Sequence, residues 1–251
     1  NSNSSQWDSA KLFQTEGPGG GGSQPITSKP RVANMPGSLN SRVVTFGTGS
    51  FFEVGDRSDN SVQSLYGIID EAGSTSSVVR DNLVAQTIVS DKDREFNVVQ
   101  EDGTKKKETF NVRVISENPI LPENKGWVLD LNSVSGERMV SEPTFPSGLS
   151  RETVRFSTLI PESDPCSSGT DGFLMEISLL SGGRTNDPVI DVNNDDKSDD
   201  KEEDVSGVGG VLSGEKLTTV RDGNIDRVVT EPGGPGFIGR PVGRQNWEQF
   251  R

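Results

Sequence analysis

The residues with the most recognisable chemistry lie in one acidic stretch, residues 191–202. Oxygen-bearing side chains recur at its first, third, fifth, ninth and twelfth places, as Asp191, Asn193, Asp195, Asp199 and Glu202. This is the ligand spacing of an EF-hand-like calcium loop, in which the seventh place, here Lys197, contributes its backbone carbonyl. Carboxylates this close together repel one another, and a divalent cation that prefers hard oxygen ligands relieves the repulsion. The stretch therefore predicts a Ca²⁺ site and a calcium-controlled protein rather than a catalyst.

The stretch departs from a true EF-hand in two ways. Its sixth place is Asp196, where the sharp turn of the loop normally requires Gly, and Asp adopts left-handed backbone angles at some energetic cost. Glycine-rich segments at 182–183 and 207–210 flank the stretch in place of helices. We therefore expect an isolated loop, inserted at about 184–210 in a non-helical scaffold. The alternative is a disordered acidic insert, because long runs of like charge are often disordered.

The absence of histidine from the sequence removes most familiar catalytic machinery. Without it the chain has no Ser-His-Asp or Cys-His nucleophile pair and no ordinary catalytic zinc site. The formal net charge is −13, and residues 191–204 hold eight carboxylates and two lysines, so nearly half of the excess lies there. Lys105-Lys106-Lys107 is the only basic run, and a hairpin tip explains it. We expect neither enzymatic activity nor a nucleic-acid partner.

The sequence also gives information on membrane crossing, processing and disulfide bonding. No apolar stretch is long enough to cross a membrane. The chain begins with Asn1 and shows no signal peptide, which indicates a processed product or a piece of a longer protein. Cys166 is the single cysteine, which rules out an internal disulfide framework. Its thiol is either buried or paired with a cysteine outside the chain.

Alternation of apolar residues with period two predicts an all-β chain. Apolar content is only 29%, with 29 Gly and 14 Pro, which favours short strands and many turns. Residues 110–114 alternate most clearly, and Asp102-Gly103 precedes them, so we expect a hairpin over 94–115. Residues 127–131 alternate as well and direct Trp127 toward a core rather than toward a ligand.

A faint internal repeat indicates strand units that stack side by side. Residues 42–48 resemble residues 152–158, and residues 65–73 resemble residues 174–182, at offsets of 110 and 109. Each unit contains a strand, a loop and a second strand that ends at a Gly turn. Such units are typical of β-propeller blades, and the offset leaves room for two blades or for one blade with large insertions. The alternative is that alternating strands recur by chance in a β-protein.

Several phrases that occur in series resemble a known family. They are Phe46-Gly-Thr-Gly49, Lys125-Gly-Trp-Val-Leu-Asp-Leu131, Ser135-Gly-Glu-Arg138 and Thr158-Leu-Ile-Pro-Glu-Ser-Asp-Pro-Cys166. From about residue 24 to residue 251, the chain resembles the C-terminal part of the PilY family, which includes the PilC proteins. Members of this family are type IV pilus tip-associated assembly factors and adhesins.

The resemblance implies that residues 24–251 form the C-terminal portion of a β-propeller, incomplete in a chain of this length. Residues 1–23, which end in a Gly-rich run, are then expected to be a flexible lead-in. The family carries a nine-residue calcium loop, whose ligands fall here on Asp191, Asn193, Asp195, the Lys197 carbonyl and Asp199. Glu202 is a ligand by spacing alone.

The resemblance also implies a function and a location. Calcium in the loop is implied to favour pilus extension over retraction, and so to support pilus biogenesis, twitching motility and adhesion. The implied partners are minor pilins at the pilus tip and a host-cell or surface receptor. The implied location is extracellular, after export through the periplasm and the outer membrane.

Two other functions stay open at this point. A periplasmic quinoprotein-like enzyme would also be a propeller, sometimes with calcium, although the three Trp residues here are scattered and no cofactor constellation is present. A structural cell-surface module would carry the same loop as a passive calcium brace.

Overall fold

The computed structural model describes residues 10–35, 37–72, 74, 77–100, 102–146, 152–161, 171–186, 188–194, 204–210, 215–222 and 225–232. For residues 210, 215–222 and 225–232 it describes the backbone alone. Within this part of the chain, no helix combines the length and the apolar character that crossing a membrane requires.

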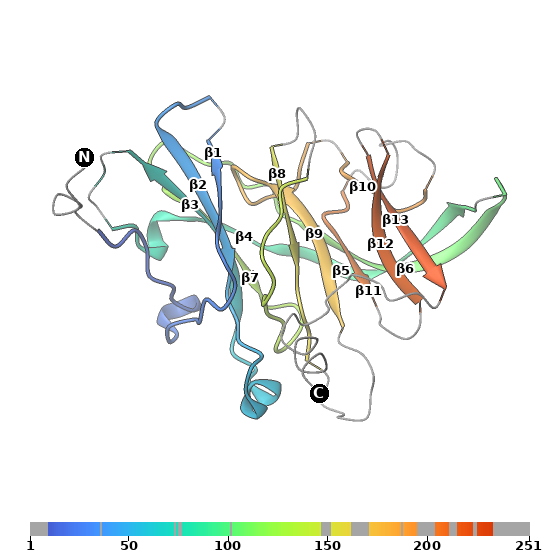
Figure 1. Ribbon diagram of the computed structural model, residues 1–251, viewed down its shortest axis with the longest axis horizontal. Helices are drawn as coiled ribbons and strands as arrows, with labels where there is room; N and C mark the ends of the chain where they lie inside the picture. Colours follow the sequence, from blue (N-terminus) through green and yellow to red (C-terminus); the bar gives the residue numbers. More distant parts are fainter. Residues whose placement is uncertain are drawn as a thin grey trace, which may run out of the picture.

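The fold is all-β, as the alternation predicts, and its strands form three sheets (Figure 1). The first has the order β1-β2-β3-β7-β4, with bounds Arg31–Asn34, Ser41–Gly47, Gln63–Glu71, Gly126–Leu131 and Val84–Gln86. The second has the order β5-β6-β11-β9-β8, with bounds Ile88–Val99, Lys105–Ile115, Gly207–Gly210, Gly172–Ser178 and Thr153–Ser157. The third has the order β10-β13-β12, with bounds Ile190–Asp191, Ile225–Pro232 and Glu215–Asp222.

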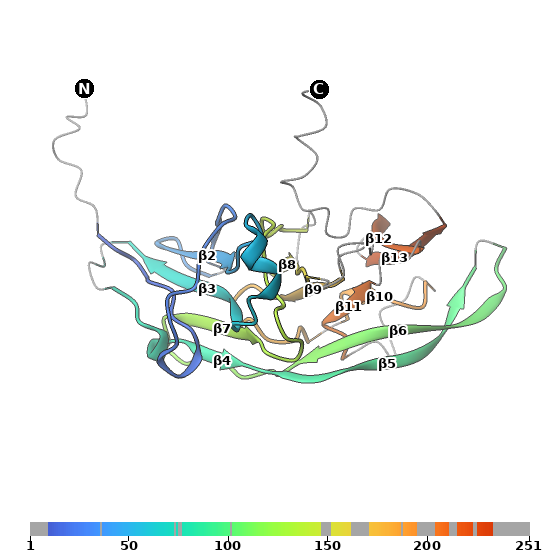
Figure 2. The same ribbon diagram turned by 90° about the horizontal axis from the view of Figure 1, so that it is seen from below.

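Among the described residues, the 3-10 helix η2 (Pro18–Gly20) precedes β1, η3 (Val54–Ser58) lies between β2 and β3, and η4 (Arg80–Asn82) lies between β3 and β4. Neighbouring strands are antiparallel except β4 beside β7 and β10 beside β13. The sheets of the described residues do not close into a ring, as expected for part of a propeller. Strand β4 leads almost directly into β5, so this segment runs along the edges of the first two sheets in turn (Figure 2).

The main core contains residues from both of the first two sheets. Its members include Trp127, Leu129 and Leu131 of β7 and Val154 and Phe156 of β8. Trp127 is fully buried, its Nε1 donates to the Leu179 carbonyl at 2.9 Å, and its ring meets that of Phe156 edge-on. The prediction that Trp127 is a core residue is confirmed.

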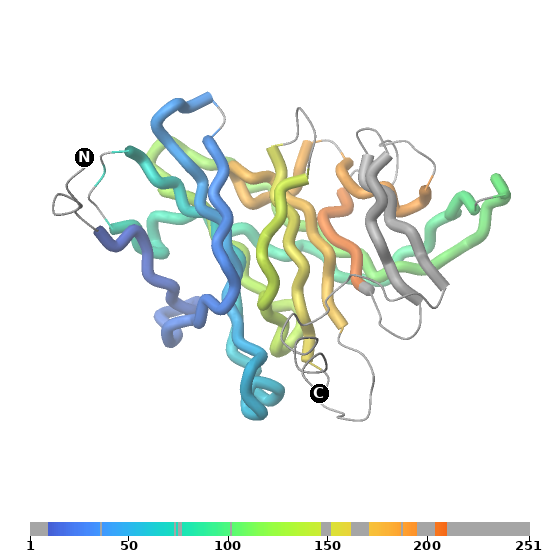
Figure 3. The backbone as a smooth tube through the Cα atoms, in the orientation of Figure 1, coloured from blue at the N-terminus to red at the C-terminus, as the bar shows by residue number. Residues whose placement is uncertain are grey.

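The internal repeat corresponds to two equivalent strand pairs. Strands β2 and β3 pair antiparallel in the first sheet, and β8 and β9 pair antiparallel in the second (Figure 3). The two copies therefore lie in different sheets, which agrees with strand units that stack as blades.

Strands β5 and β6 form the predicted hairpin, which begins earlier than expected, at Ile88. At its turn Gly103 has φ 79°, and the Asp102 carboxylate accepts from the Thr104 N–H at 2.9 Å. Lys105 opens β6, so the basic run lies at the hairpin tip as predicted.

Part of the segment that we expected to be a flexible lead-in packs on the first sheet. Leu12 and Phe13 contact a cluster that includes Phe46 and Tyr66, and the Leu12 carbonyl accepts from Val78 N–H at 2.8 Å. These two apolar residues give the segment a surface to bury, which its Gly-rich end does not reveal.

Candidate functional site

The structure describes only the start of the predicted calcium loop. Asp191 is the last residue of β10 and is buried, and Asn193 follows two residues later. Asp195, Lys197, Asp199 and Glu202 lie outside the described residues. The structure thus places two of the six predicted ligand residues, and all six stay predictions as calcium ligands.

Residues 189–194 and 204–208, which we call the flanks of the acidic loop, pack on the β5–β6 hairpin. The hairpin contributes four apolar side chains and the flanks contribute five, in one buried cluster: Phe96, Val98, Phe110, Val112, Val189, Ile190, Val192, Val205 and Val208. Because both flanks bury apolar residues against the same hairpin, the loop begins and ends on a rigid base.

Polar contacts fix the same two flanks to strand β5. The Asn193 carbonyl accepts from Val99 N–H at 2.8 Å, and Asn194 Nδ2 donates to the Val99 carbonyl at 3.0 Å. At the far end Asp204 forms an ion pair with Arg94 at 2.7 Å. The start of the loop is therefore bonded to Val99 of β5, and its end is bonded to Arg94, five residues earlier in that strand.

The described start of the loop fits a hard cation such as Ca²⁺. Asp191 and Asn193 offer carboxylate and amide oxygens, the ligand types that Ca²⁺ takes. Asn194 has φ 56°, the only positive φ of a non-glycine residue in the described chain, so the backbone bends sharply directly after the second ligand. Among the described residues, no three His, Cys, Asp or Glu side chains gather closely enough to hold a metal.

The left-handed backbone of Asn194 leads to a testable prediction. We expect Asn194→Ala to be less stable than Asn194→Gly by about 1 kcal/mol, because a Cβ disfavours this conformation and both variants lose the same amide. Asn97, an exposed residue of β5, is the matched control, and there Gly should be less stable than Ala. Urea unfolding of the four variants measures both differences in stability. Equal stability of Asn194→Ala and Asn194→Gly would contradict the left-handed backbone conformation of residue 194.

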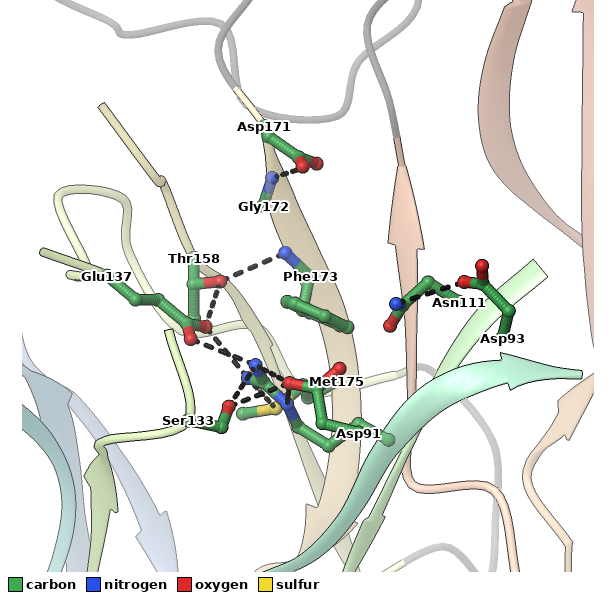
Figure 4. Close-up of polar contacts among 11 residues, drawn as sticks. Asp91, Asp93, Asn111, Ser133, Glu137, Thr158, Asp171, Gly172, Phe173 and Met175 are labelled. Carbon is green, nitrogen blue, oxygen red and sulfur yellow. Dashed lines mark hydrogen bonds and ion pairs between the residues drawn. The ribbon is translucent and has the colours of Figure 1, made fainter. Parts of the chain in front are cut away.

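A second, unpredicted polar cluster lies on β6, which pairs with the strand that follows the loop; Arg113, Glu137 and Thr158 are buried in it, and Ser133 lies at its exposed edge. We call it the buried charge cluster and define it as Arg113, Glu137, Asp91, Ser133 and Thr158 (Figure 4). Arg113 of β6 donates to both Glu137 oxygens at 2.8 and 2.9 Å and to Asp91 at 2.7 Å. Thr158 and Ser133 donate to the carboxylates of Glu137 and Asp91 at 2.6 and 2.7 Å.

The environment of Arg113 explains how a buried guanidinium stays charged. Burial acts to lower the pKa of Arg113, but its hydrogen bonds and the charges of Glu137 and Asp91 outweigh burial and raise that pKa. The ring of Phe173 lies against the guanidinium, with 3.6 Å from its centroid to the guanidinium carbon. Charge, hydrogen bonds and an aromatic face thus all stabilise the cation.

The buried charge cluster connects directly to the end of the acidic loop. Ser206 N–H donates to the Arg113 carbonyl at 2.8 Å, and Gly207 of β11 lies opposite Arg113. Glu137 belongs to Ser135-Gly-Glu-Arg138, a phrase that resembles the family but whose sequence predicts no role for this carboxylate. The residues bonded to Arg113 come from segments distant in the sequence, so no local sequence pattern predicts the cluster.

Asp171, at the edge of the buried charge cluster, leads to a pH-dependent prediction. Burial raises its pKa above the ordinary 3.8, the Gly172 N–H opposes this, and the charges of Glu137 and Asp91 add to the rise. The folded protein therefore binds this proton more tightly than the unfolded chain. The associated stability is fully present below pH 3.8 and is lost as pH rises through the folded-state pKa.

We expect Asp171→Asn to stabilise the protein at pH 7, because the amide keeps an acceptor for Gly172 N–H, 2.7 Å away, without the charge. Asp102→Asn is the control of opposite sign, since hydrogen bonds from Thr104 lower the pKa of Asp102. Urea unfolding from about pH 3.5 to pH 7 measures the change in the free energy of unfolding for both variants. A loss of stability in Asp171→Asn at pH 7 would show that the carboxylate is favoured in the fold.

Comparisons with known proteins agree with this architecture. Residues 5–100 match the family model of the PilY1 beta-propeller domain. The chain is 31% identical over 262 residues to the type IV pilus biogenesis factor PilY1 of Pseudomonas aeruginosa PAO1, covering 90% of this chain and 21% of that protein. It is 30% identical over 260 residues to a PilY1 homolog of Xylella fastidiosa, covering 97% of this chain and 19% of that protein.

A comparison with solved structures also finds a PilY1 protein. The crystal structure of the Pseudomonas aeruginosa PilY1 C-terminal domain superposes with a TM-score of 0.67 at 25% identity, covering 89% of this chain and 48% of that chain. The chain thus spans about a fifth of the length of these curated relatives and about half of the solved domain.

Proposed function

This chain belongs to the PilY family, in which it corresponds to C-terminal propeller sequence, and on that premise we propose that it works as a module of a type IV pilus assembly factor. The observation that carries the proposal is the match over nine-tenths of the chain to proteins named type IV pilus biogenesis factors. The proposed partners are minor pilins, and the proposed place of action is the pilus tip outside the cell, with adhesion to a surface or host receptor. The proposed role is mechanical and recognitional, not enzymatic.

We further propose that Ca²⁺ binds the acidic loop. Asp191, Asn193, Asp195, Asp199 and Glu202 would hold the ion together with the Lys197 carbonyl. The bound ion would supply positive charge among eight carboxylates. The chain's own contribution is the rigid base, because both flanks are fixed to β5 and share a buried apolar cluster.

This arrangement suits a switch. Without the cation, mutual repulsion of the carboxylates favours a loosened loop, whereas the flanks stay attached to the hairpin. A change of order confined to the loop would then alter the partner surface without unfolding the sheets.

Calorimetric titration of the purified chain with CaCl₂ tests the calcium proposal. We expect one site in the wild type, and about tenfold or greater weakening in Asp195→Ala and in Asp191→Ala, equivalent to about 1.4 kcal/mol or more. Asp102→Ala, at the hairpin turn, removes a carboxylate from elsewhere and should bind as the wild type does. No heat from the wild type, or an unchanged isotherm for Asp195→Ala, would refute the site.

Pilus counts and twitching assays distinguish a regulatory ion from a passive brace. We expect a strain that carries Asp191→Ala in the complete protein to show fewer surface pili and reduced twitching. Normal protein abundance with normal piliation and twitching would favour the passive brace. The Asp102→Ala strain is again the control.

A further inference from the structure

The connection between β2 and β3 exposes apolar side chains on a firmly held loop. In this loop, residues 50–59, Phe52 is 70% exposed and Val54 is 91% exposed. Ile26 is 46% exposed and lies beside the loop, because it forms a β-bridge with Gly49. Single exposed apolar residues are common, so the question is what distinguishes this group.

The first distinction is that one buried cation holds both ends of the loop. Arg138 is almost fully buried. Its Nη1 donates to the Ser50 carbonyl at 2.8 Å, its Nη2 donates to the Asp59 carbonyl, and its Nε donates to the Gly136 carbonyl at 2.9 Å. A single guanidinium therefore fixes the separation of the two ends.

The second distinction is that a carboxylate inside the loop fixes its apolar tip. Asp56 Oδ2 accepts from the N–H groups of Phe52 at 2.7 Å and Glu53 at 3.0 Å, and from the Ser50 hydroxyl at 2.8 Å. These bonds lower the pKa of Asp56, with the Glu53 N–H as the largest cause, so the carboxylate stays ionised and keeps accepting. The helix η3 follows directly, and the backbone around Phe52 is ordered before any partner arrives.

Order in the free state matters for binding. A preordered backbone loses little conformational freedom on association, and aromatic anchors dominate the energetics of protein interfaces. Phe52 and Val54, presented on such a loop, have the properties of an anchor that inserts into a pocket.

The charges around the tip restrict the class of partner. Residues 50–59 contain three acids, Glu53, Asp56 and Asp59, and one base, Arg57, which gives a local charge of −2, or of −1 when the buried Arg138 is counted with them. A second copy of this loop or an anionic membrane surface would be repelled, and a surface with Lys and Arg around an apolar pocket would be complementary.

The loop lies at the strand ends of the first sheet and not on a face of that sheet. It connects the end of β2 to the start of β3 and projects from the strand ends, where Figure 1 shows η3 beyond the sheet. Propeller blades stack through their faces, so further blades pack beside the sheet and not over its strand ends.

We propose that the 50–59 loop is a docking site for a folded protein partner that offers an apolar pocket rimmed by Lys and Arg. This inference goes beyond the proposed calcium-controlled role and does not depend on it.

Photo-crosslinking from position 52 tests the inference in the complete protein in its native host. Phe52 is replaced by p-benzoylphenylalanine, and the same probe at Val79, 55% exposed at the opposite end of β3, is the control. We expect one predominant second protein at position 52 only, with a contact peptide that combines apolar residues with Lys or Arg. No crosslink, a crosslink to the same chain or to a second copy, or an acidic contact peptide would overturn the inference.

Binding measurements with purified proteins test the inference quantitatively. With the crosslinked protein as the probe, Phe52→Ser should weaken binding at least tenfold and Glu53→Lys several-fold, while thermal unfolding stays unchanged because both side chains are exposed. Val79→Ser should bind as the wild type does. Unchanged affinity of Phe52→Ser would refute the docking role even if a crosslink forms.

Discussion

Replacing Glu137 by Ala is expected to lower the free energy of unfolding by about 3 kcal/mol or more, because it leaves a buried cation undercompensated. Arg113 would lose both of its bonds to Glu137 and keep only Asp91 as a charged partner. The hydroxyl of Thr158 would lose its acceptor as well. Urea unfolding of the wild type and the variant measures the difference.

Two further variants test whether burial, and not ion pairing as such, produces the effect. Glu71→Ala breaks the exposed pair with Lys125, whose side chains are 50% and 38% exposed, and should change stability by about 1 kcal/mol or less. The double variant Arg113→Met with Glu137→Leu should be more stable than Glu137→Ala, because it removes both charges together. A Glu137→Ala protein no less stable than Glu71→Ala would contradict the role of the cluster.

Truncating Trp127 to Ala is expected to destabilise the protein by about 3–5 kcal/mol, through a large cavity and an unpaired Leu179 carbonyl. The indole fits between two glycines that are far apart in the sequence. A Cβ on Gly67 would lie 2.3 Å from the indole, and a Cβ on Gly182 would lie 2.2 Å from it. Both glycines are therefore required by the tryptophan and not by a turn alone.

Coupling between these positions provides the check. Gly67→Ala should destabilise strongly by overpacking, by about 1–3 kcal/mol or more. Gly55→Ala is the matched control, because a Cβ there meets nothing within 4 Å and should change stability little. In Gly67→Ala combined with Trp127→Ala, the two effects should not add, since the clash disappears with the indole. Additive losses would show that Gly67 acts independently of Trp127.

The elements that the sequence predicts well are those whose signal is local. The β5–β6 hairpin follows from alternation and from Asp102-Gly103, since a turn and two strands need only neighbouring residues. The strand that carries Trp127 and the two repeated strand pairs follow for the same reason. The ligand spacing of the acidic loop is likewise local, and its rigid base on β5 is an addition from the structure.

The adjacent residues Glu137 and Arg138 mark the limit of sequence reasoning. Their types fix their charges, yet Glu137 bonds to Arg113, whereas Arg138 binds the carbonyls of Ser50 and Asp59. By itself the sequence determined the all-β character, the hairpin, the repeat and the spacing of oxygen ligands, because each depends on residues close together in the chain. Only the tertiary structure decided which charged side chains are buried and what they hold, because burial depends on segments that the fold brings from 24 to 88 residues away.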